Sequence, residues 1–285
     1  MSRSITGQTR VAGVVGDPVR HSLSPTLHNA WLEAAGIDGV YVAFPAATST
    51  FVDFVRGLRG GVVRGLNITA PFKEEALALA DHAFDTATRA GAANLLIFED
   101  NGRIIADNTD GEGLIYAFRS QTEGFDPGAG PVIILGAGGA ARGAAAAFLA
   151  AGAPRVDFIN RTPQKAQALA ALFGDRARAV SLADGWNARR EAAVVINATP
   201  LGLDGGIKGE QTIDDLPADC VVMDMVYRPL RTELIAQAEA RGLRTVDGLQ
   251  MLIGQAIPSF QSLFGRPPPP IDVRALALAV LETNR

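Results

Sequence analysis

The chain has 285 residues, 48% hydrophobic and 20% charged, which is long enough for about two globular domains. Its formal net charge of -4 argues against a nucleic-acid-binding surface, and no cluster of lysines and arginines offsets that charge. The single cysteine, Cys220, lies in an apolar run, and the three histidines lack metal-ligand spacing, so we expect neither a disulfide nor a metal. The sequence contains no secretory signal and no run of ~20 apolar residues, which predicts a cytoplasmic protein without a membrane span.

The first polar loop follows an expected strand over 11–16 and leads into an expected helix that ends near Gly36. Ser24 followed by Pro25 is typical of a helix start, so Ser22 and Ser24 are expected beside a helix N-terminus. The N–H groups there attract a carboxylate. Two interpretations stay open: the serines bind a carboxylate, or Ser24 only caps the helix while Ser22 is solvated.

Strands over 40–44 and 62–68 are expected to alternate with helices over 48–58 and 72–80, which predicts a parallel sheet covered by helices. Ligand-binding residues of such sheets lie at the carboxyl ends of the strands. Asn67, Thr69 and Lys73 fall at such an end. A lysine in a first helical turn opposes the helix dipole, which hints at a functional role, although a solvated surface lysine is the alternative.

A β-hairpin is expected from two apolar runs, 92–99 and 103–106, on either side of Asn101-Gly102. The first strand of the hairpin opens with Gly91-Ala92-Ala93-Asn94, and the second ends in Asp107-Asn108-Thr109-Asp110-Gly111, before a helix over 113–119. This polar segment is either a capping loop or one wall of a site.

The segment 131–142 combines a short apolar strand, a glycine turn and an alanine-rich helix, with the pattern G-x-G-x-x-A at Gly136, Gly138 and Ala141. Gly136 permits the tight turn, and Gly138 lets the backbone approach a pyrophosphate at the helix N-terminus. The pattern indicates a dinucleotide-binding unit. An ordinary α/β turn rich in small residues is the alternative.

The second strand of this unit, 155–159, ends in Asn160-Arg161-Thr162 without an acidic residue. An acid here would hold the ribose 2′-hydroxyl of NAD, whereas the guanidinium of Arg161, with Lys165 one turn later, suits the 2′-phosphate of NADP. NADP is therefore favoured, and a solvated arginine in a helix cap is the alternative. The remaining strands are expected over 177–182, 193–196, 220–223 and 244–246, with helices over 230–240, from about 248 to 264 and after Asp272. The fold class is therefore α/β.

Taken together, these segments resemble the shikimate dehydrogenase family over nearly the full length of the chain. The motifs occur in the family's order: His-Ser-x-Ser-Pro at 21–25, Asn-x-Thr-x-Pro-x-Lys at 67–73, Gly-Ala-x-Asn at 91–94, Asn-Thr-Asp-Gly at 108–111, Gly-Ala-Gly-Gly-Ala at 136–140, Asn-Arg-Thr at 160–162, Asn-Ala-Thr-Pro-Leu-Gly at 197–202, Asp-Met-x-Tyr at 224–227 and Met-Leu-x-x-Gln at 251–255.

The resemblance implies two α/β domains with a cleft between them. One is a substrate-binding domain with a sheet that contains parallel strands, formed by residues 1–110 and 248–285. The other is a Rossmann NADP-binding domain, 111–247. The implied reaction is the reversible NADPH-dependent reduction of 3-dehydroshikimate to shikimate, in the biosynthesis of chorismate and the aromatic amino acids.

The resemblance also implies the roles of individual residues. Lys73 and Asp110 are the implied catalytic pair. The sequence leaves open which of the two delivers the proton. We favour Lys73 as the group that stabilises the developing alkoxide and donates the proton, with Asp110 orienting it. The residues implied to bind substrate are Ser22, Ser24, Asn67, Thr69, Asn94, Asp110, Tyr227 and Gln255. The residues implied to bind the cofactor are Gly136, Ala137, Gly138, Gly139, Ala140, Asn160, Arg161, Thr162, Lys165, Thr199, Met225 and Gly248.

One position departs from the family pattern, because Leu95 stands where the family usually has threonine. We expect its side chain to point into the core. Ser24 favours shikimate over quinate, since quinate-using relatives tend to carry threonine there. Three alternatives remain: a quinate/shikimate dehydrogenase of broader specificity, a non-catalytic NADP-binding sensor on the same scaffold, and an unrelated two-domain reductase with a catalytic lysine. The sequence does not fix the oligomeric state and leaves a homodimer open.

Overall fold

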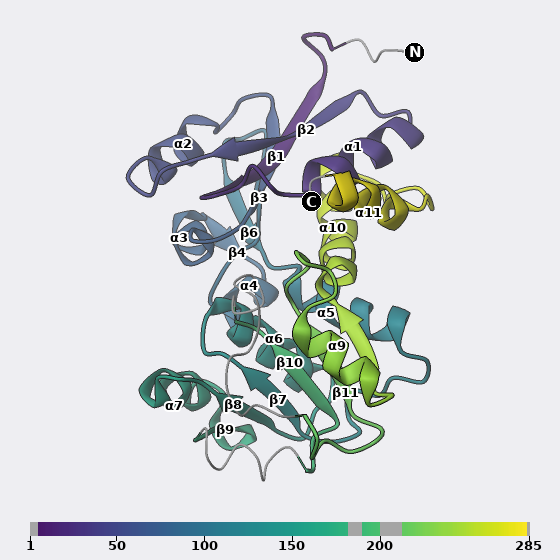
Figure 1. Cartoon of the computed structure of the whole chain (residues 1–285). Helices are drawn as coiled ribbons and strands as arrows, with labels where there is room; N and C mark the ends of the chain where they lie inside the picture. Colours follow the sequence, from purple (N-terminus) through teal and green to yellow (C-terminus); the bar gives the residue numbers. More distant parts are fainter. Residues whose placement is uncertain (1–4, 182–189, 200–212, 284–285) are drawn as a thin grey trace. The chain divides into compact units, whose positions relative to one another are not determined.

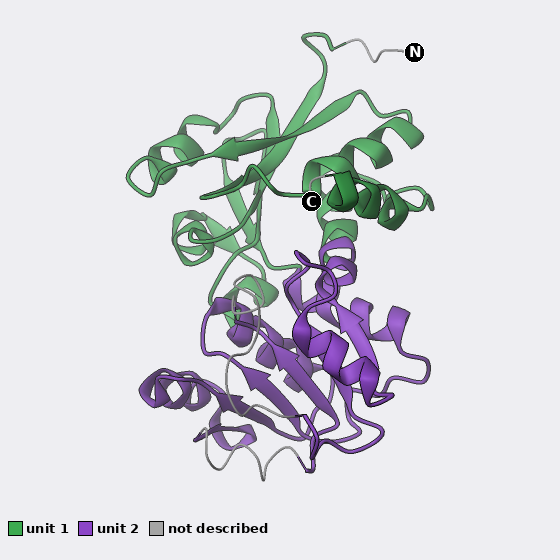
Figure 2. Cartoon of the chain, viewed as in Figure 1, with its two compact units in different colours: residues 1–109, 255–285 green, residues 110–254 purple. Residues whose placement is uncertain are grey.

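The computed structural model describes residues 5–181, 190–199 and 213–283. The chain divides into two compact units, one formed by Met1–Thr109 with Gln255–Arg285 and the other by Asp110–Gly254 (Figure 2). Each unit contains one six-stranded sheet (Figure 1). The fold is therefore α/β, as the sequence predicts. The sheet of the first unit is mixed, and the sheet of the second unit is parallel and Rossmann-like.

The sheet of the first unit has the strand order β2-β1-β3-β5-β6-β4. β1 pairs in parallel with β2 and β3, while β5 runs antiparallel to both β3 and β6. The predicted hairpin is thus confirmed, and it makes the sheet mixed. Its strands are β1 (Arg10–Gly16), β2 (Gly39–Pro45), β3 (Val63–Ile68), β4 (His82–Ala83), β5 (Leu95–Phe98) and β6 (Ile104–Asp107), and its helices are α1 (Ser24–Ala34), α2 (Phe51–Gly57), α3 (Lys73–Leu79), α4 (Asp85–Ala90), α11 (Val273–Thr283) and the later part of α10 (Gly248–Phe264).

A core of apolar side chains joins α2 and α3 to this sheet. Phe51 at the start of α2 and Phe72, the residue before α3, stack with ring centroids 4.3 Å apart and planes inclined by 2°. Leu95 is fully buried, which confirms that its side chain points into the core. Burial of these side chains fixes the start of α3 against the sheet.

The sheet of the second unit has the order β12-β11-β10-β7-β8-β9, and all five strand pairs are parallel. Successive residues of its strands enter two separate cores, since Ile134 packs with α6 and Ile133 and Leu135 pack with α9. Cys220 is buried in the second of these cores, as expected. The elements are α5 (Asp110–Gln121), β7 (Val132–Leu135), α6 (Gly139–Ala150), β8 (Val156–Ile159), α7 (Pro163–Ala171), η1 (Gly174–Arg176), β9 (Ala177–Val180), β10 (Val194–Asn197), β11 (Val221–Asp224), α9 (Glu233–Ala240) and β12 (Arg244–Asp247).

Three helix starts differ from the sequence prediction by three residues. α2 begins at Phe51 rather than Thr48, and α5 begins at Asp110 rather than Gly113. Two acidic residues in the first turn of α5, Asp110 and Glu112, interact favourably with the positive end of the helix dipole. α9 begins at Glu233 because the Thr232 hydroxyl caps it, accepting a hydrogen bond from Ile235 N at 3.4 Å. Asp272 precedes α11, and its Oδ1 accepts a hydrogen bond from Ala275 N at 3.0 Å. This confirms the prediction that Asp272 caps the last helix.

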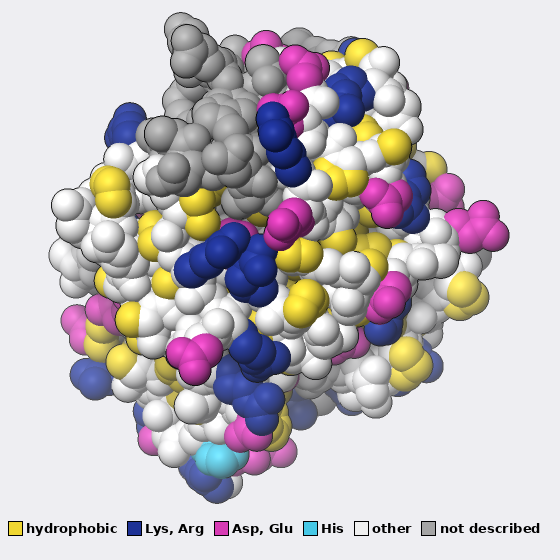
Figure 3. Space-filling view, turned by 90° about the horizontal axis from the view of Figure 1, so that it is seen from below, with side chains coloured by type: hydrophobic (Ala, Val, Ile, Leu, Met, Phe, Trp, Pro, Cys, Tyr) yellow, Lys and Arg dark blue, Asp and Glu magenta, His cyan; other side chains and the backbone are white. Residues whose placement is uncertain are grey.

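The described helices include none that is both long enough and apolar enough to cross a membrane. On the face of the molecule seen in Figure 3, Lys and Arg side chains gather with Asp and Glu side chains among them. This face therefore presents charges of both signs.

Candidate active site

The loop before α1 holds two of the predicted carboxylate ligands. Ser22 is partly exposed, and its Oγ accepts a hydrogen bond from Ser24 N at 3.2 Å. Ser24 is 5% exposed and is the first residue of α1 rather than its cap, because Leu23 occupies the cap position without a side-chain hydrogen bond. The interpretation in which Ser24 only caps the helix is therefore wrong. Ser24 is instead buried at the start of α1, and Ser22 in the preceding loop is partly exposed.

Asn67 at the end of β3 lies in a buried network of amides and hydroxyls. Its Nδ2 donates to the Ser259 hydroxyl at 2.9 Å and to the Asn94 carbonyl oxygen at 3.2 Å. Its Oδ1 accepts from the Tyr41 hydroxyl at 2.8 Å. Since the Asn94 carbonyl can only accept, this contact fixes which way the Asn67 amide points.

Asn94 links the network to the segment before α5. Its Oδ1 accepts from Thr109 N at 2.8 Å, and its Nδ2 donates to Thr109 Oγ1 at 2.9 Å and to Gln255 Oε1 at 3.4 Å. Ser259, one turn after Gln255 on α10, lies 3.2 Å from Thr109 Oγ1. The structure therefore brings three predicted site residues together, Asn67, Asn94 and Gln255, from segments far apart in the sequence.

The sequence reasoning assigned no role to Tyr41, Thr109 or Ser259, which complete this network. Thr109 lies in the Asn-Thr-Asp-Gly motif at 108–111, and Ser259 follows Gln255 by one helical turn, so the sequence gives a weak indication that both belong to the site. Tyr41 reads as an ordinary apolar residue of a strand and had none.

Thr69 and Lys73 flank the turn between β3 and α3. Thr69 N donates to the Val15 carbonyl oxygen at 3.0 Å, and a Cβ added at Gly16 would lie 2.2 Å from Thr69 Cγ2, so this close approach requires glycine. Lys73 is the first residue of α3, and its carbonyl oxygen accepts from Ala93 N at 2.8 Å. Both side chains are partly exposed at the carboxyl end of β3.

Asp110 begins α5 directly after Thr109, the residue whose backbone and hydroxyl Asn94 holds. Its carboxylate is partly exposed. Asp110 belongs to the second compact unit and Lys73 to the first, so their pairing stays a prediction.

The turn between β7 and α6 has the geometry that the glycine pattern predicts. Gly136 has φ +119°, and a Cβ there would lie 3.1 Å from Thr199 Cγ2 and 3.2 Å from the Ala198 carbonyl oxygen. A Cβ at Gly138 or Gly139 would meet nothing within 4 Å. The space in front of the α6 N-terminus is therefore open, and the first turn has neither a side-chain cap nor an acidic residue. A diphosphate fits there, next to the N–H groups of the helix.

Arg161 follows β8, which pairs with β7, so it lies near the carboxyl edge of the same sheet. Arg161, Thr162 and Lys165 are exposed, and Asn160 Nδ2 donates to the Thr162 carbonyl oxygen at 2.9 Å. The absence of an acid and the two exposed cations fit the 2′-phosphate of NADP.

A second buried network orders the loops after β10 and β11. Asn197 Oδ1 accepts from Thr199 N at 3.1 Å and from Thr199 Oγ1 at 2.7 Å. Asn197 Nδ2 donates to Asp224 Oδ1 at 3.0 Å, and Asp224 Oδ2 accepts from Thr232 Oγ1 at 2.8 Å. Burial raises the pKa of Asp224, while its hydrogen bonds partly oppose that shift. The network positions Thr199, which is predicted to bind the cofactor.

Met225, Tyr227 and Gly248 complete the predicted set at this edge of the sheet. Met225 N donates to the Asn197 carbonyl oxygen at 3.1 Å, and a Cβ at Gly248 would lie 2.2 Å from the Met225 carbonyl oxygen. Burial raises the pKa of the Tyr227 phenol. Residues 200–202, the end of the Asn-Ala-Thr-Pro-Leu-Gly motif, lie outside the described residues.

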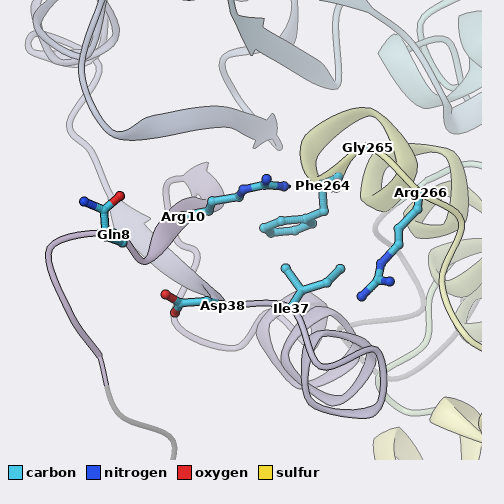
Figure 4. A pocket seen from close by; sticks show the side chains of 7 residues that line it. All are labelled: Gln8, Arg10, Ile37, Asp38, Phe264, Gly265 and Arg266. Carbon is cyan, nitrogen blue, oxygen red and sulfur yellow. Dashed lines mark hydrogen bonds between the residues drawn. The ribbon is translucent and has the colours of Figure 1, made fainter.

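One cavity of about 470 Å³ lies elsewhere in the first unit (Figure 4). Two of its lining residues, Arg10 and Arg266, bind main-chain carbonyls where helices end, namely those of Phe264 and Ala35. This use as helix C-caps accounts for both arginines. The predicted site residues do not line the cavity, and the described residues include no group of three or more His, Cys, Asp or Glu suited to a metal ion.

Two family models match the chain. The model described as "Shikimate dehydrogenase substrate binding domain" matches residues 14–96, and the model described as "Shikimate / quinate 5-dehydrogenase" matches residues 125–203. A curated relative, shikimate dehydrogenase (NADP(+)) of Caulobacter vibrioides, is 56% identical over 286 residues, covering 99% of both chains.

Two solved structures have nearly the same fold as this chain. Shikimate 5-dehydrogenase from Thermus thermophilus, in complex with NADP(H) and shikimate, is 36% identical, with a TM-score of 0.85 over 95% of this chain and 99% of that chain. Quinate dehydrogenase from Corynebacterium glutamicum, in complex with NAD, is 27% identical, with a TM-score of 0.85 over 96% of this chain and 99% of that chain.

Proposed function

The chain belongs to the shikimate dehydrogenase family and has NADP-dependent shikimate dehydrogenase activity, and we propose how its residues carry that activity. The reaction is the reversible reduction of the ketone of 3-dehydroshikimate to the hydroxyl of shikimate, a step of aromatic amino-acid biosynthesis. We assign substrate binding to residues 1–110 with 248–285 and NADP binding to residues 111–247. We place the reaction in the cytoplasm.

The observation that carries the assignment of the substrate site is the buried amide network of Asn67, Asn94 and Gln255. Amides that are held rigidly by neighbouring groups suit the recognition of a polyhydroxylated ring, because their donors and acceptors stay at fixed positions. Ser22 and Ser24 at the start of α1 supply hydroxyls for the substrate carboxylate. We assign Tyr227 to substrate binding as well.

NADPH, when bound, supplies the hydride for the ketone carbon. As the hydride arrives, negative charge develops on the ketone oxygen, and the Lys73 ammonium stabilises that charge and donates the proton. We assign Asp110 the role of keeping Lys73 charged and orienting it. Asn94 supports this geometry through Thr109, the residue before Asp110.

The cofactor residues divide into two groups. The turn residues Gly136 to Ala140 place backbone N–H groups against the diphosphate, with Gly138 and Gly139 leaving the space for it. Asn160, Arg161, Thr162 and Lys165 hold the 2′-phosphate, while Thr199, Met225 and Gly248 border the nicotinamide end.

Replacement of Lys73 tests the catalytic assignment. Lys73→Met is expected to lower kcat by at least about 100-fold with little change in KM for 3-dehydroshikimate, because general acid catalysis contributes about that factor. Lys165→Met is the matched control, and it should raise KM for NADPH while kcat stays within about twofold. Full kcat in Lys73→Met would refute the role of Lys73.

A further inference from the structure

The side-chain hydroxyl of Ser259 joins three segments of the first unit. Ser259 is fully buried on α10, one turn after Gln255. Its Oγ lies 2.9 Å from Asn67 Nδ2 at the end of β3 and 3.2 Å from Thr109 Oγ1, in the residue before α5. It also lies 3.0 Å from the main-chain carbonyl oxygen of Gln255. Because the side chain is buried, no solvent takes the place of a lost contact.

Only one assignment of hydrogens satisfies all three contacts of Ser259. The carbonyl oxygen of Gln255 cannot donate, so the single hydroxyl hydrogen of Ser259 goes to it. Both lone pairs of the Ser259 oxygen are then left to accept, one from Asn67 Nδ2 and the other from the Thr109 hydroxyl. Toward Asn67, Ser259 is therefore an acceptor.

This assignment fixes which atom the Asn67 side chain offers to a ligand. Its Nδ2 donates to Ser259 Oγ and, at 3.2 Å, to the Asn94 carbonyl oxygen. A reversed amide would place oxygen against an accepting oxygen at both contacts. Asn67 Oδ1 accepts from the Tyr41 hydroxyl at 2.8 Å and has a second lone pair. Asn67 is therefore oriented to accept a hydrogen bond from a ligand hydroxyl.

Thr109 depends less on Ser259 than Asn67 does. Its hydroxyl oxygen accepts from Asn94 Nδ2 at 2.9 Å, and it lies 3.3 Å from Asn94 Oδ1. Without Ser259, the Thr109 hydroxyl can turn its hydrogen to that oxygen. The described residues give Asn67 Nδ2 no acceptor besides Ser259 and the Asn94 carbonyl. Loss of the Ser259 hydroxyl therefore affects mainly Asn67.

We propose that Ser259 is a positioning residue that determines substrate specificity, by holding the Asn67 amide with Oδ1 as the atom offered to a ring hydroxyl of the substrate. A rigid acceptor at this place distinguishes a hydroxyl from a position that has no hydrogen to donate. The inference rests on the proposed function, because that function assigns Asn67 to the substrate.

Ser259→Ala tests this role, because it removes the hydroxyl and keeps a residue that favours the helix. The substrates are shikimate, 4-deoxyshikimate and 5-deoxyshikimate, each of which keeps the hydroxyl that is oxidised. Asn67→Ala identifies the analogue that lacks the hydroxyl bound by Asn67, because KM for this analogue should not change in that variant. We expect Ser259→Ala to raise KM for shikimate about five- to tenfold. Its KM for that analogue, its KM for NADP and its kcat should stay within about twofold of the unmodified chain.

Two further variants separate positioning from general damage. Ser262→Ala, at an exposed serine of the same helix, is the matched control and should change none of these values. If Ser259 acts through Asn67, adding Ser259→Ala to Asn67→Ala should raise KM for shikimate by less than about twofold. An equal rise in KM for shikimate and for the analogue would overturn the proposal, since a general loss of structure affects both. Unchanged KM for shikimate in Ser259→Ala would overturn it as well.

The unmodified chain provides a test that applies even where Ser259→Ala does not fold. KM for one of the two analogues should exceed KM for shikimate at least about tenfold, because Asn67 Oδ1 loses its donor there. Equal KM values for shikimate and both analogues would contradict the proposal and leave the proposed function intact. If the unmodified chain does not oxidise shikimate at all, the proposed function fails, and this inference fails with it.

Discussion

The Asn197–Asp224 network provides a quantitative test of how the nucleotide-binding unit is held together. Asp224 is 1% exposed, and its Oδ1 accepts from both Asn197 Nδ2 and Val226 N at 3.0 Å. Asp224→Ala leaves these two buried donors without an acceptor, and each such group costs about 1–3 kcal/mol. Relief of the buried charge offsets part of this cost. We therefore expect the free energy of unfolding to fall by about 2–4 kcal/mol.

Asp224→Asn should behave differently, because its side-chain oxygen can still accept from Asn197 and Val226. The Thr232 hydroxyl can rotate to accept from the new amide, and the raised pKa of Asp224 shows that its ionised form is costly to bury. We expect this variant to lose less than about 1 kcal/mol.

Urea unfolding of the chain without ligands measures both variants, with Asp175→Ala, an exposed aspartate in the same unit, as the control. KM for NADPH should rise in Asp224→Ala, because Asn197 holds Thr199 only while Asp224 holds Asn197. A loss below about 1 kcal/mol for Asp224→Ala would refute the argument.

Three further predictions concern burial, space and charge. Burial lowers the pKa of His28 from 6.5 to about 3, so the stability that its neutral form contributes is full above pH 6.5 and is lost as pH falls toward 3. Between about pH 7 and about pH 4, the free energy of unfolding of His28→Phe should therefore fall by about 3 kcal/mol less than that of the unmodified chain. Equal falls in the two chains would contradict this. Gly138→Ala should keep the thermal unfolding midpoint but raise KM for NADPH at least about tenfold. Gly136→Ala should lower the free energy of unfolding by about 1–2 kcal/mol, because Gly136, unlike Gly138, has positive φ and close neighbours. An unchanged KM in Gly138→Ala would refute the assigned diphosphate position. Arg161→Gln should raise KM for NADPH about tenfold or more and leave KM for NADH unchanged, and equal changes would refute its contact with the 2′-phosphate.

The nucleotide-binding unit could be predicted from the sequence because its signals are local. A short apolar strand, a glycine turn and an alanine-rich helix follow one another within 131–142, and the backbone of Gly136 has the positive φ that the turn requires. The absence of an acid after β8 is likewise read from adjacent residues. Such features depend on the chain nearby and little on the tertiary structure.

The substrate-binding network could be predicted only in part, because its contacts join distant segments. Asn67 and Ser259 are separated by 192 positions, and the apolar pattern of α10 conceals the serine. Tyr41 alternates with valines on β2 and reads as a core residue. The local cap rule failed at Ser24, which is buried as the first residue of α1, while Leu23 occupies the cap position.

The most direct test of the proposed function follows the loss of NADPH absorbance with 3-dehydroshikimate, beside parallel reactions with NADH and with 3-dehydroquinate. We predict fast turnover with NADPH and 3-dehydroshikimate and turnover at least about tenfold slower in the parallel reactions. Comparable rates with NADH or 3-dehydroquinate would indicate a quinate/shikimate dehydrogenase of broader specificity. Binding of NADPH without any turnover would contradict the catalytic assignment and favour a sensor.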